Sequence, residues 1–184
     1  MNWIIILAIA AGGLALYAVA VYNRLVGLRQ RTREAWSGID VQLKRRSNLI
    51  PNLVETVRGY VTHEKDLLDQ ITRSRAAASG SDSVAERAAV EGQLGAVLGR
   101  LFAVAEAYPD LKASRNFQDL HASLDGIERD IQHVRRYYNG AVRMLNIAVQ
   151  SFPSNLIAGL FGFRQADYFE LDDPSERAVP QVAF

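Results

Sequence analysis

A run of twenty residues without a charged side chain, from Trp3 to Tyr22, constrains the fold of this chain most strongly. As an α-helix rising ~1.5 Å per residue, the run spans about 30 Å, which is the thickness of a bilayer's hydrocarbon core. Trp3 and Tyr22 stand at its two ends, where aromatic rings prefer to meet the membrane surface. The run therefore predicts a transmembrane anchor over residues 1–23, with Trp3 and Tyr22 as membrane-interface residues.

The alternative to an anchor is a cleaved signal peptide, because "AVA" at residues 18–20 resembles a cleavage site. No basic residue precedes the run, and the run is longer than a signal-peptide core requires, so we favour the anchor. Cations follow the run closely at Arg24, Arg29, Arg31 and Arg33. The positive-inside rule then predicts a single-pass protein with its N-terminus outside and residues 24–184 in the cytoplasm.

The remainder of the chain shows the apolar spacing of long helices. Between residues 114 and 150, apolar side chains recur at alternating steps of three and four, which is typical of a coiled-coil seam. Ser83 and Glu86 form a capping box that marks the start of another helix. No segment alternates in the manner of a strand. The spacing predicts helices over residues 24–46, 51–77, 83–107 and 114–150.

Four helices with short connections predict an all-α fold. We expect the anchor to be followed by an antiparallel up-and-down four-helix bundle with coiled-coil-like seams. This bundle should occupy residues 24–162. Residues 163–184 mix aromatic, acidic and proline residues and are expected to form an irregular C-terminal tail.

Pro51 decides how the first two bundle helices meet. A proline inside a helix removes one hydrogen bond and clashes with the preceding turn, at ~3 kcal/mol or more, whereas the first turn tolerates it. Ser47 or Asn48 could cap a helix that starts there. We therefore favour a break at residues 45–48 over one kinked helix, although the apolar spacing continues in register through the proline.

Composition and motif spacing argue against an enzyme. The chain has no cysteine, which excludes disulfides, thiolate metal sites and cysteine nucleophiles, and its net charge of +1 gives no overall footprint for nucleic acid. His63 and Glu64 lack the second histidine of a metalloprotease motif.

Asp130 and His133 have the i, i+3 spacing of a di-metal bundle, but such a site needs two such pairs and two further carboxylates. We therefore predict no catalytic residue, no metal ligand and no cofactor. A metal-binding or catalytic bundle that uses His63, Glu64, Asp130 and His133 is the alternative.

Three adjacent cations, Lys44, Arg45 and Arg46, are a candidate contact for a protein partner or a phospholipid. The simpler interpretation is a solvated helix end, where cations interact favourably with the helix dipole. The wider basic segment 24–46 keeps open the alternative of a protein that binds a lipid surface.

Nine ordered stretches of the chain together form a specific pattern. They are "YNRLV" at 22, "EAWSGIDVQLKRRSNLIPNLVETVRGY" at 34, "AYPDLKAS" at 107, "NF" at 116, "YN" at 138, "FPSN" at 152, "GF" at 162, "YFE" at 168 and the closing "VAF". This pattern resembles the LemA family of bacterial membrane proteins. The resemblance implies a short outer N-terminus, one inner-membrane helix and a cytoplasmic helical bundle. It brings no catalytic residue or cofactor, because the family's biochemical role is uncharacterised.

The resemblance also suggests a partner, because family members are often encoded near a membrane-associated protein with a TPM domain. From these observations we predict a membrane-anchored scaffold or adaptor of the bacterial cell envelope. It should bind a protein partner or a second copy of itself, and no nucleic acid.

Overall fold

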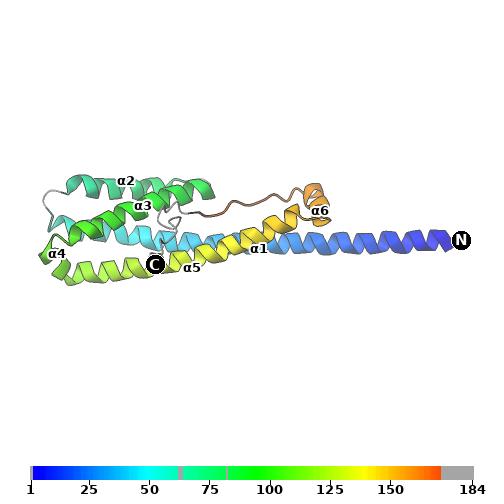
Figure 1. The fold of residues 1–184 in the computed structure, drawn as a ribbon, viewed down its shortest axis with the longest axis horizontal. Coiled ribbons are helices and arrows are strands. Elements are labelled where there is room, and N and C mark those ends of the chain that lie inside the picture. The colour runs from blue at the N-terminus through cyan, green and yellow to red at the C-terminus, as the bar shows by residue number, and fades with distance from the viewer. Residues whose placement is uncertain (1, 62–63, 82, 171–184) are drawn as a thin grey trace, which may run out of the picture. The chain divides into compact units, whose positions relative to one another are not determined.

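The computed structural model describes residues 2–61, 64–81 and 83–170, and all the regular secondary structure within them is helical. The predicted all-α class is confirmed. Packing divides the chain into unit 1, Met1–Gly38 with Arg136–Asp167, and unit 2, Ile39–Arg135 with Tyr168–Phe184. These are units of packing, so the predicted boundaries after residues 23 and 162 stay predictions. The elements are α1 (Asn2–Arg58), α2 (Lys65–Ser79), α3 (Val84–Ala105), α4 (Pro109–Ala113), α5 (Arg115–Gln150) and α6 (Ser154–Leu160) (Figure 1).

Unit 2 is the helical bundle. The second part of α1, helices α2 and α3, and the first part of α5 reverse direction in turn, as an up-and-down bundle requires (Figure 1). The Ser83 side chain accepts a hydrogen bond from the Glu86 amide over 3.1 Å, which is half of the predicted capping box. The four segments and α4 share one apolar core, which includes Leu53, Val57, Ile71, Leu94, Leu101, Leu111, Phe117 and Leu124.

The predicted break at residues 45–48 is wrong, because α1 continues through Pro51 and ends at Arg58. The predicted helix over 51–77 is instead divided between α1 and α2. The chain leaves α1 at Gly59, and the amides of Tyr60 and Val61 both donate to the Val57 carbonyl. Glycine is a poor helix former, so the turn falls where the helix is weakest.

Arg75 of α2 explains why the helix survives the proline. Pro51 has no N–H, so the Ser47 carbonyl four residues earlier loses its usual partner within the helix. The Arg75 Nε donates to this carbonyl over 2.9 Å and also to the Ser47 hydroxyl oxygen over 3.2 Å. A bond between helices thus replaces the bond that the proline removes.

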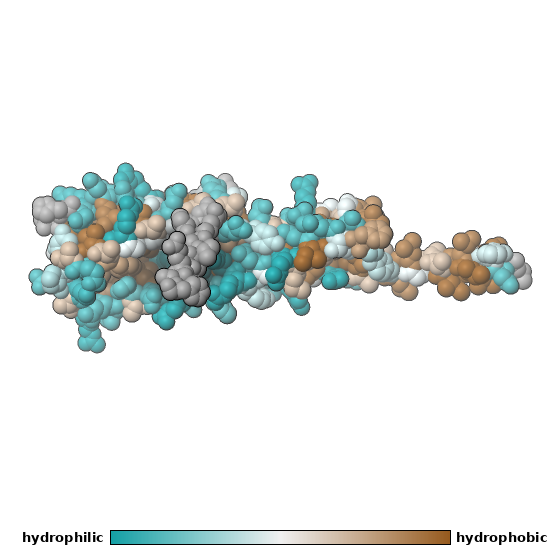
Figure 2. Space-filling model, viewed as in Figure 1, coloured by the Kyte–Doolittle hydropathy of each residue, from teal (hydrophilic) through white to brown (hydrophobic). Residues whose placement is uncertain are grey.

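In unit 1, the first part of α1 is exposed. Residues 2–17 are all exposed, and the most apolar stretch of α1 has a mean hydropathy of 2.6 with 6% of its residues buried (Figure 2). Helix α3 is also long and apolar enough to cross a membrane, but several of its residues lie in the core of unit 2. From Val21 onwards one side of α1 is buried, and the core of unit 1 consists of Val21, Leu25, Leu28, Leu145, Ala148, Ala158 and Phe163.

Two side chains of α5 hold the segment that follows α6 in unit 1. The Asn146 amide donates to the Ala166 carbonyl and accepts from the Ala166 amide, each over 2.9 Å. The Tyr138 hydroxyl donates to the Asp167 carbonyl over 2.9 Å. The tail is therefore irregular up to residue 170, as predicted, but its first residues are fixed to α5. Residues 171–184 lie outside the described part of the chain.

Replacing Arg75 with methionine should destabilise the fold by about 1–2 kcal/mol, because the Ser47 carbonyl then loses its donor. In a Pro51→Ala background the same replacement should cost clearly less, because residue 51 then supplies an N–H. Thermal unfolding of the full chain in mild detergent, followed by circular dichroism, measures both losses. Arg73→Met, at an exposed position of α2, is the control and should stay within ~0.5 kcal/mol. Equal losses from Arg75→Met in the two backgrounds would contradict this account.

Burial, aided by the Asp167 carboxylate, raises the pKa of Tyr138 from 10.0 to about 12. Between these values the folded chain keeps a proton that the unfolded chain releases, so stability should fall as pH rises from about 10 towards 12. Tyr138→Phe should weaken this dependence and cost about 1 kcal/mol at neutral pH through the lost hydrogen bond.

Denaturation midpoints measured across this pH range test the prediction. The neighbouring Tyr137→Phe serves as the control, because Tyr137 is exposed. If Tyr138→Phe followed the same pH dependence as the unmodified chain, the assigned role of the hydroxyl would be wrong.

Candidate functional site

Arg46 lies at the centre of a buried charge cluster in unit 2. Its side chain is 3% exposed, and its Nη2 lies 2.5 Å from Glu91 Oε2 and 3.2 Å from the Glu91 carbonyl oxygen. Its Nη1 donates to Glu128 Oε2 over 2.7 Å. Glu91, on α3, is as deeply buried as Arg46, whereas Glu128, on α5, is partly open to solvent. The guanidinium therefore joins three helices of the bundle.

Arg87 places a second cation on the same carboxylate. Its Nε lies 3.1 Å from Glu91 Oε1, and its Nη2 lies 3.8 Å from the Asp40 carboxylate. Both carboxylate oxygens of Glu91 thus face a guanidinium, so its negative charge is balanced inside the bundle. A buried ion pair of this kind contributes more to the choice of one helix register than to net stability. We interpret the cluster as a structural element.

The three cations of the predicted contact do not face the same environment in the structure. Lys44 and Arg45 are exposed, but Arg46 is turned inward to Glu91 and Glu128. The interpretation of these residues as a helix end is wrong, because α1 continues to Arg58. Contact with a partner stays a prediction for Lys44 and Arg45, whereas the charge of Arg46 is already used inside the bundle.

Sequence reasoning missed Glu91 and Asn146. Glu91 follows Ala88 and precedes Leu94 at three-residue steps, on the buried stripe of α3. Asn146 lies in the apolar stretch between Leu145 and Ala148. In each case the available signal was a polar side chain on an otherwise apolar helix face, but the spacing alone does not name its partner.

Among the alternative metal-binding residues that the structure describes, Glu64 lies far from Asp130 and His133. His63 lies outside the described residues, and Glu64 precedes the first turn of α2, at the end of the bundle where α4 also lies (Figure 1). Asp130 is fifteen residues, or ~22 Å, along α5 from that end, and His133 is exposed on the next turn. Among the described residues no three His, Asp or Glu side chains form a group that could hold a metal ion.

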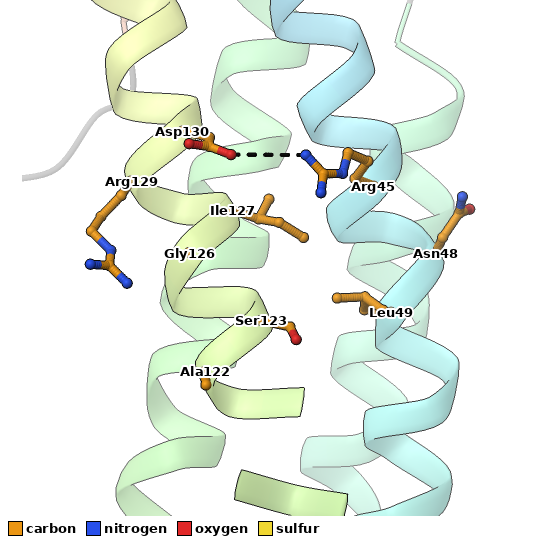
Figure 3. Close-up of a pocket in the computed structure, with 9 residues that line it drawn as sticks. All are labelled: Arg45, Asn48, Leu49, Ala122, Ser123, Gly126, Ile127, Arg129 and Asp130. Atoms are coloured by element: carbon orange, nitrogen blue, oxygen red, sulfur yellow. Dashed lines mark ion pairs between the residues drawn. The ribbon is translucent and has the colours of Figure 1, made fainter. Parts of the chain in front are cut away.

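A groove of about 710 Å³ lies between α1 and α5 of unit 2 (Figure 3). Leu49 and Ile127 face each other across it, and the Arg45 guanidinium approaches the Asp130 carboxylate to 3.9 Å above them. The lining residues are Arg45, Asn48, Leu49, Ala122, Ser123, Gly126, Ile127, Arg129 and Asp130.

The groove exists because α5 presents small residues to α1. Ala122, Ser123 and Gly126 supply little side-chain volume, and a Cβ added at Gly126 would meet no atom within 4 Å. The Ser123 hydroxyl donates to the Asp119 carbonyl over 2.7 Å and is therefore engaged locally. The groove thus combines an apolar floor, small walls and a charged edge.

The predicted membrane-interface residues both lie on α1. Trp3 is 78% exposed, in the apolar first part of the helix. Tyr22 packs edge-on against Phe161, with ring centroids 4.8 Å apart, and against Phe163 at 5.7 Å. The interface role of both residues stays a prediction, and the Tyr22 contacts show which segment lies beside it.

Comparisons with known proteins match the chain to one family model and to several relatives. The model of the LemA family matches residues 35–184. The magnetosome protein MamQ 2 of Paramagnetospirillum magneticum is 28% identical over 81% of this chain and 64% of its own length. MamQ of Magnetospirillum gryphiswaldense is 25% identical over 88% of this chain and 70% of its own length. The protein LemA of Metamycoplasma hominis is 29% identical over 74% of this chain, and this chain spans 63% of it.

Removing the carboxylate of Glu91 should be strongly destabilising. Glu91→Leu leaves the Arg46 charge buried without its main partner, which costs about 3–5 kcal/mol in comparable pairs. Adding Arg46→Met to Glu91→Leu should recover part of this loss, because Arg46 then buries no charge, whereas Arg87 still lacks Glu91. Chemical denaturation of the full chain in detergent gives the free energies of unfolding.

The exposed Arg45–Asp130 pair supplies the matched control. Asp130→Asn should change the free energy of unfolding by at most ~1 kcal/mol, because the pair is open to solvent. If the double variant were no more stable than Glu91→Leu alone, the effect would not come from an uncompensated buried charge.

Proposed function

Because the chain belongs to the LemA family, we propose that it is a membrane-anchored helical adaptor whose bundle binds a partner protein in the groove between α1 and α5. Family membership and the relatives described above support a membrane-associated helical protein of uncharacterised role. The observation that carries the proposal is α1 itself. One uninterrupted helix contains the exposed apolar residues 2–17 and also Arg45, Asn48 and Leu49, which line the groove.

The first part of α1 serves as a single transmembrane span. Its side chains are apolar and exposed, a combination that is costly in water and favourable in lipid. Relatives named as magnetosome proteins are consistent with a membrane location. The anchor lies in the bacterial inner membrane. The four arginines that follow it, between residues 24 and 33, favour an orientation with the N-terminus outside and the bundle in the cytoplasm.

The groove suits one helix of a partner protein. Small residues on α5 allow close approach of a second backbone, Leu49 and Ile127 offer apolar contact, and Arg45 and Asp130 can pair with polar side chains at the edge. A membrane-associated protein with a TPM domain is one partner class that the family resemblance implies, and a second copy of this chain is the other.

A binding role fits these side chains better than catalysis does. The carboxylates nearest to the groove are engaged, since Asp130 lies beside Arg45 and Glu128 accepts from Arg46. The small residues of α5 are sufficient to explain why the groove is open, so an enzymatic activity is not needed to account for it.

A photo-crosslinking residue at Ser123 tests the proposal in intact cells that express the full chain. We expect a discrete adduct, either with a second protein or with a second copy, to be identified by mass spectrometry. The same residue at Asp69, an exposed position of α2, should give little or no adduct. Equal yields at the two positions, or no adduct at Ser123, would contradict the assigned groove.

Gly126→Leu separates binding from folding. A leucine side chain would enter the groove without meeting a neighbouring atom at its Cβ, and it should stabilise α5 by up to ~1 kcal/mol through helix propensity. The adduct at Ser123 should nevertheless fall several-fold. An unchanged adduct in this more stable variant would show that the partner does not occupy the groove.

A further inference from the structure

The segment around α6 has an unusual surface. Residues 151–163 contain no charged side chain. Four of their large apolar side chains are exposed: Phe152 at 80%, Leu156 at 63%, Leu160 at 77% and Phe161 at 55%. Single exposed apolar residues are common, but four so close together indicate a surface that another apolar phase covers. We call these four residues the α6 apolar face.

The other side of α6 is buried. Ala158 is 1% exposed, and it lies in one core with Val21 and Leu25 of α1, against which Ile157 also packs. The inner side of the segment therefore holds it to α1, whereas within the described part of unit 1 its outer side exposes the α6 apolar face together with the uncharged Ser151 and Asn155. A helix that faced only water on its outer side would be expected to carry polar residues there.

The position of α6 along α1 identifies what covers it. Helix α6 packs at Val21 and Leu25, where the exposed apolar run of α1 ends (Figure 1). Tyr22 contacts Phe161 directly, with ring centroids 4.8 Å apart. Figure 2 shows hydrophobic surface both on the first part of α1 and on the adjoining α6 region. The α6 apolar face thus continues the surface of the proposed span.

Cations flank this surface on the side away from the span. Arg24 is exposed and lies three residues after Val21 in α1. Arg164 is exposed and directly follows Phe163. Apolar side chains bordered by arginines are typical of a segment that lies in a membrane surface, with the cations at the lipid phosphates. A bilayer requires apolar side chains followed by cations along α1, whereas a protein partner does not require this order.

We propose that residues 152–161 form a membrane-interface element, whose four exposed apolar side chains enter the boundary between lipid headgroups and acyl chains beside the span of α1. The proposal rests on the proposed anchor and adds a second attachment. With two attachments, the depth and the tilt of unit 1 at the membrane are both restricted.

Because the sequence has no cysteine, a single introduced cysteine can be labelled specifically. Single cysteines at Leu160, Ile5 and Ser37 of the full chain are labelled with an environment-sensitive fluorophore. All three positions are exposed, so labelling should not disturb a core. Each protein is reconstituted into vesicles of phosphatidylcholine and phosphatidylglycerol, with and without lipids that carry a spin-label quencher.

Lipid quenching should be strong at Leu160 and at Ile5, and several-fold weaker at Ser37, which lies ~22 Å beyond Tyr22 along α1. Aqueous iodide should quench in the opposite order. Quenching by lipid at Ile5 without quenching at Leu160 would overturn the interface element and leave the anchor intact. No lipid quenching at Ile5 would overturn the anchor itself, and the proposal with it.

A further outcome distinguishes lipid from protein as the cover. A Leu160 label that neither iodide nor the lipid quencher reaches would lie against a second protein copy, which also overturns the proposal. Leu160→Lys provides an independent readout, because it changes only an exposed side chain. It should make the label at Phe152→Cys several-fold less accessible to the lipid quencher, whereas Ser37→Lys should leave that accessibility unchanged.

Discussion

The bond from Arg75 to the Ser47 carbonyl lets α1 run unbroken from residue 2 to residue 58. Pro51 would otherwise leave that carbonyl without a partner in the interior of the helix. Because the helix is continuous, residues 51–58, which bring Leu53 and Val57 into the core of unit 2, belong to the same element as the apolar first part of α1.

A second constraint comes from the charge buried at Arg46. Removing a guanidinium and a carboxylate from water is expensive, and their attraction repays it only when the geometry is good. Glu91 meets this condition, because two guanidinium groups and a backbone carbonyl share the site. Any shift of α1 along α3 by one turn would bury the cation without its partner. The cluster therefore favours a single register of the bundle.

The two surfaces proposed for function differ in chemistry. The groove between α1 and α5 has a small apolar floor and a charged edge, which suits a polypeptide. The α6 apolar face is bordered by arginines and continues the surface of the proposed span, which suits a lipid boundary. An adaptor needs both properties, because it must stay at the membrane and must also hold a second molecule there.

The sequence alone determined the element types. Helices, the apolar run and the N-cap at Ser83 follow from residues that are near one another in the chain, and such local patterns are readable without a structure. The core residues of α5 also followed, because Phe117 and Leu124 lie on the three- and four-residue steps predicted for residues 114–150. The groove did not follow, since the small residues of α5 define a space only once α1 lies opposite them.

What only the tertiary structure decided depends on partners that are distant along the chain. The helix passes Pro51 because Arg75, 28 residues away from Ser47, supplies a donor. Arg46 turns inward because Glu91 and Glu128 come from two other helices. Asn146 fixes Ala166, 20 residues later. A spacing pattern reports which face of a helix is apolar, but a single buried hydrogen bond or ion pair between helices is decided by the packing of all of them.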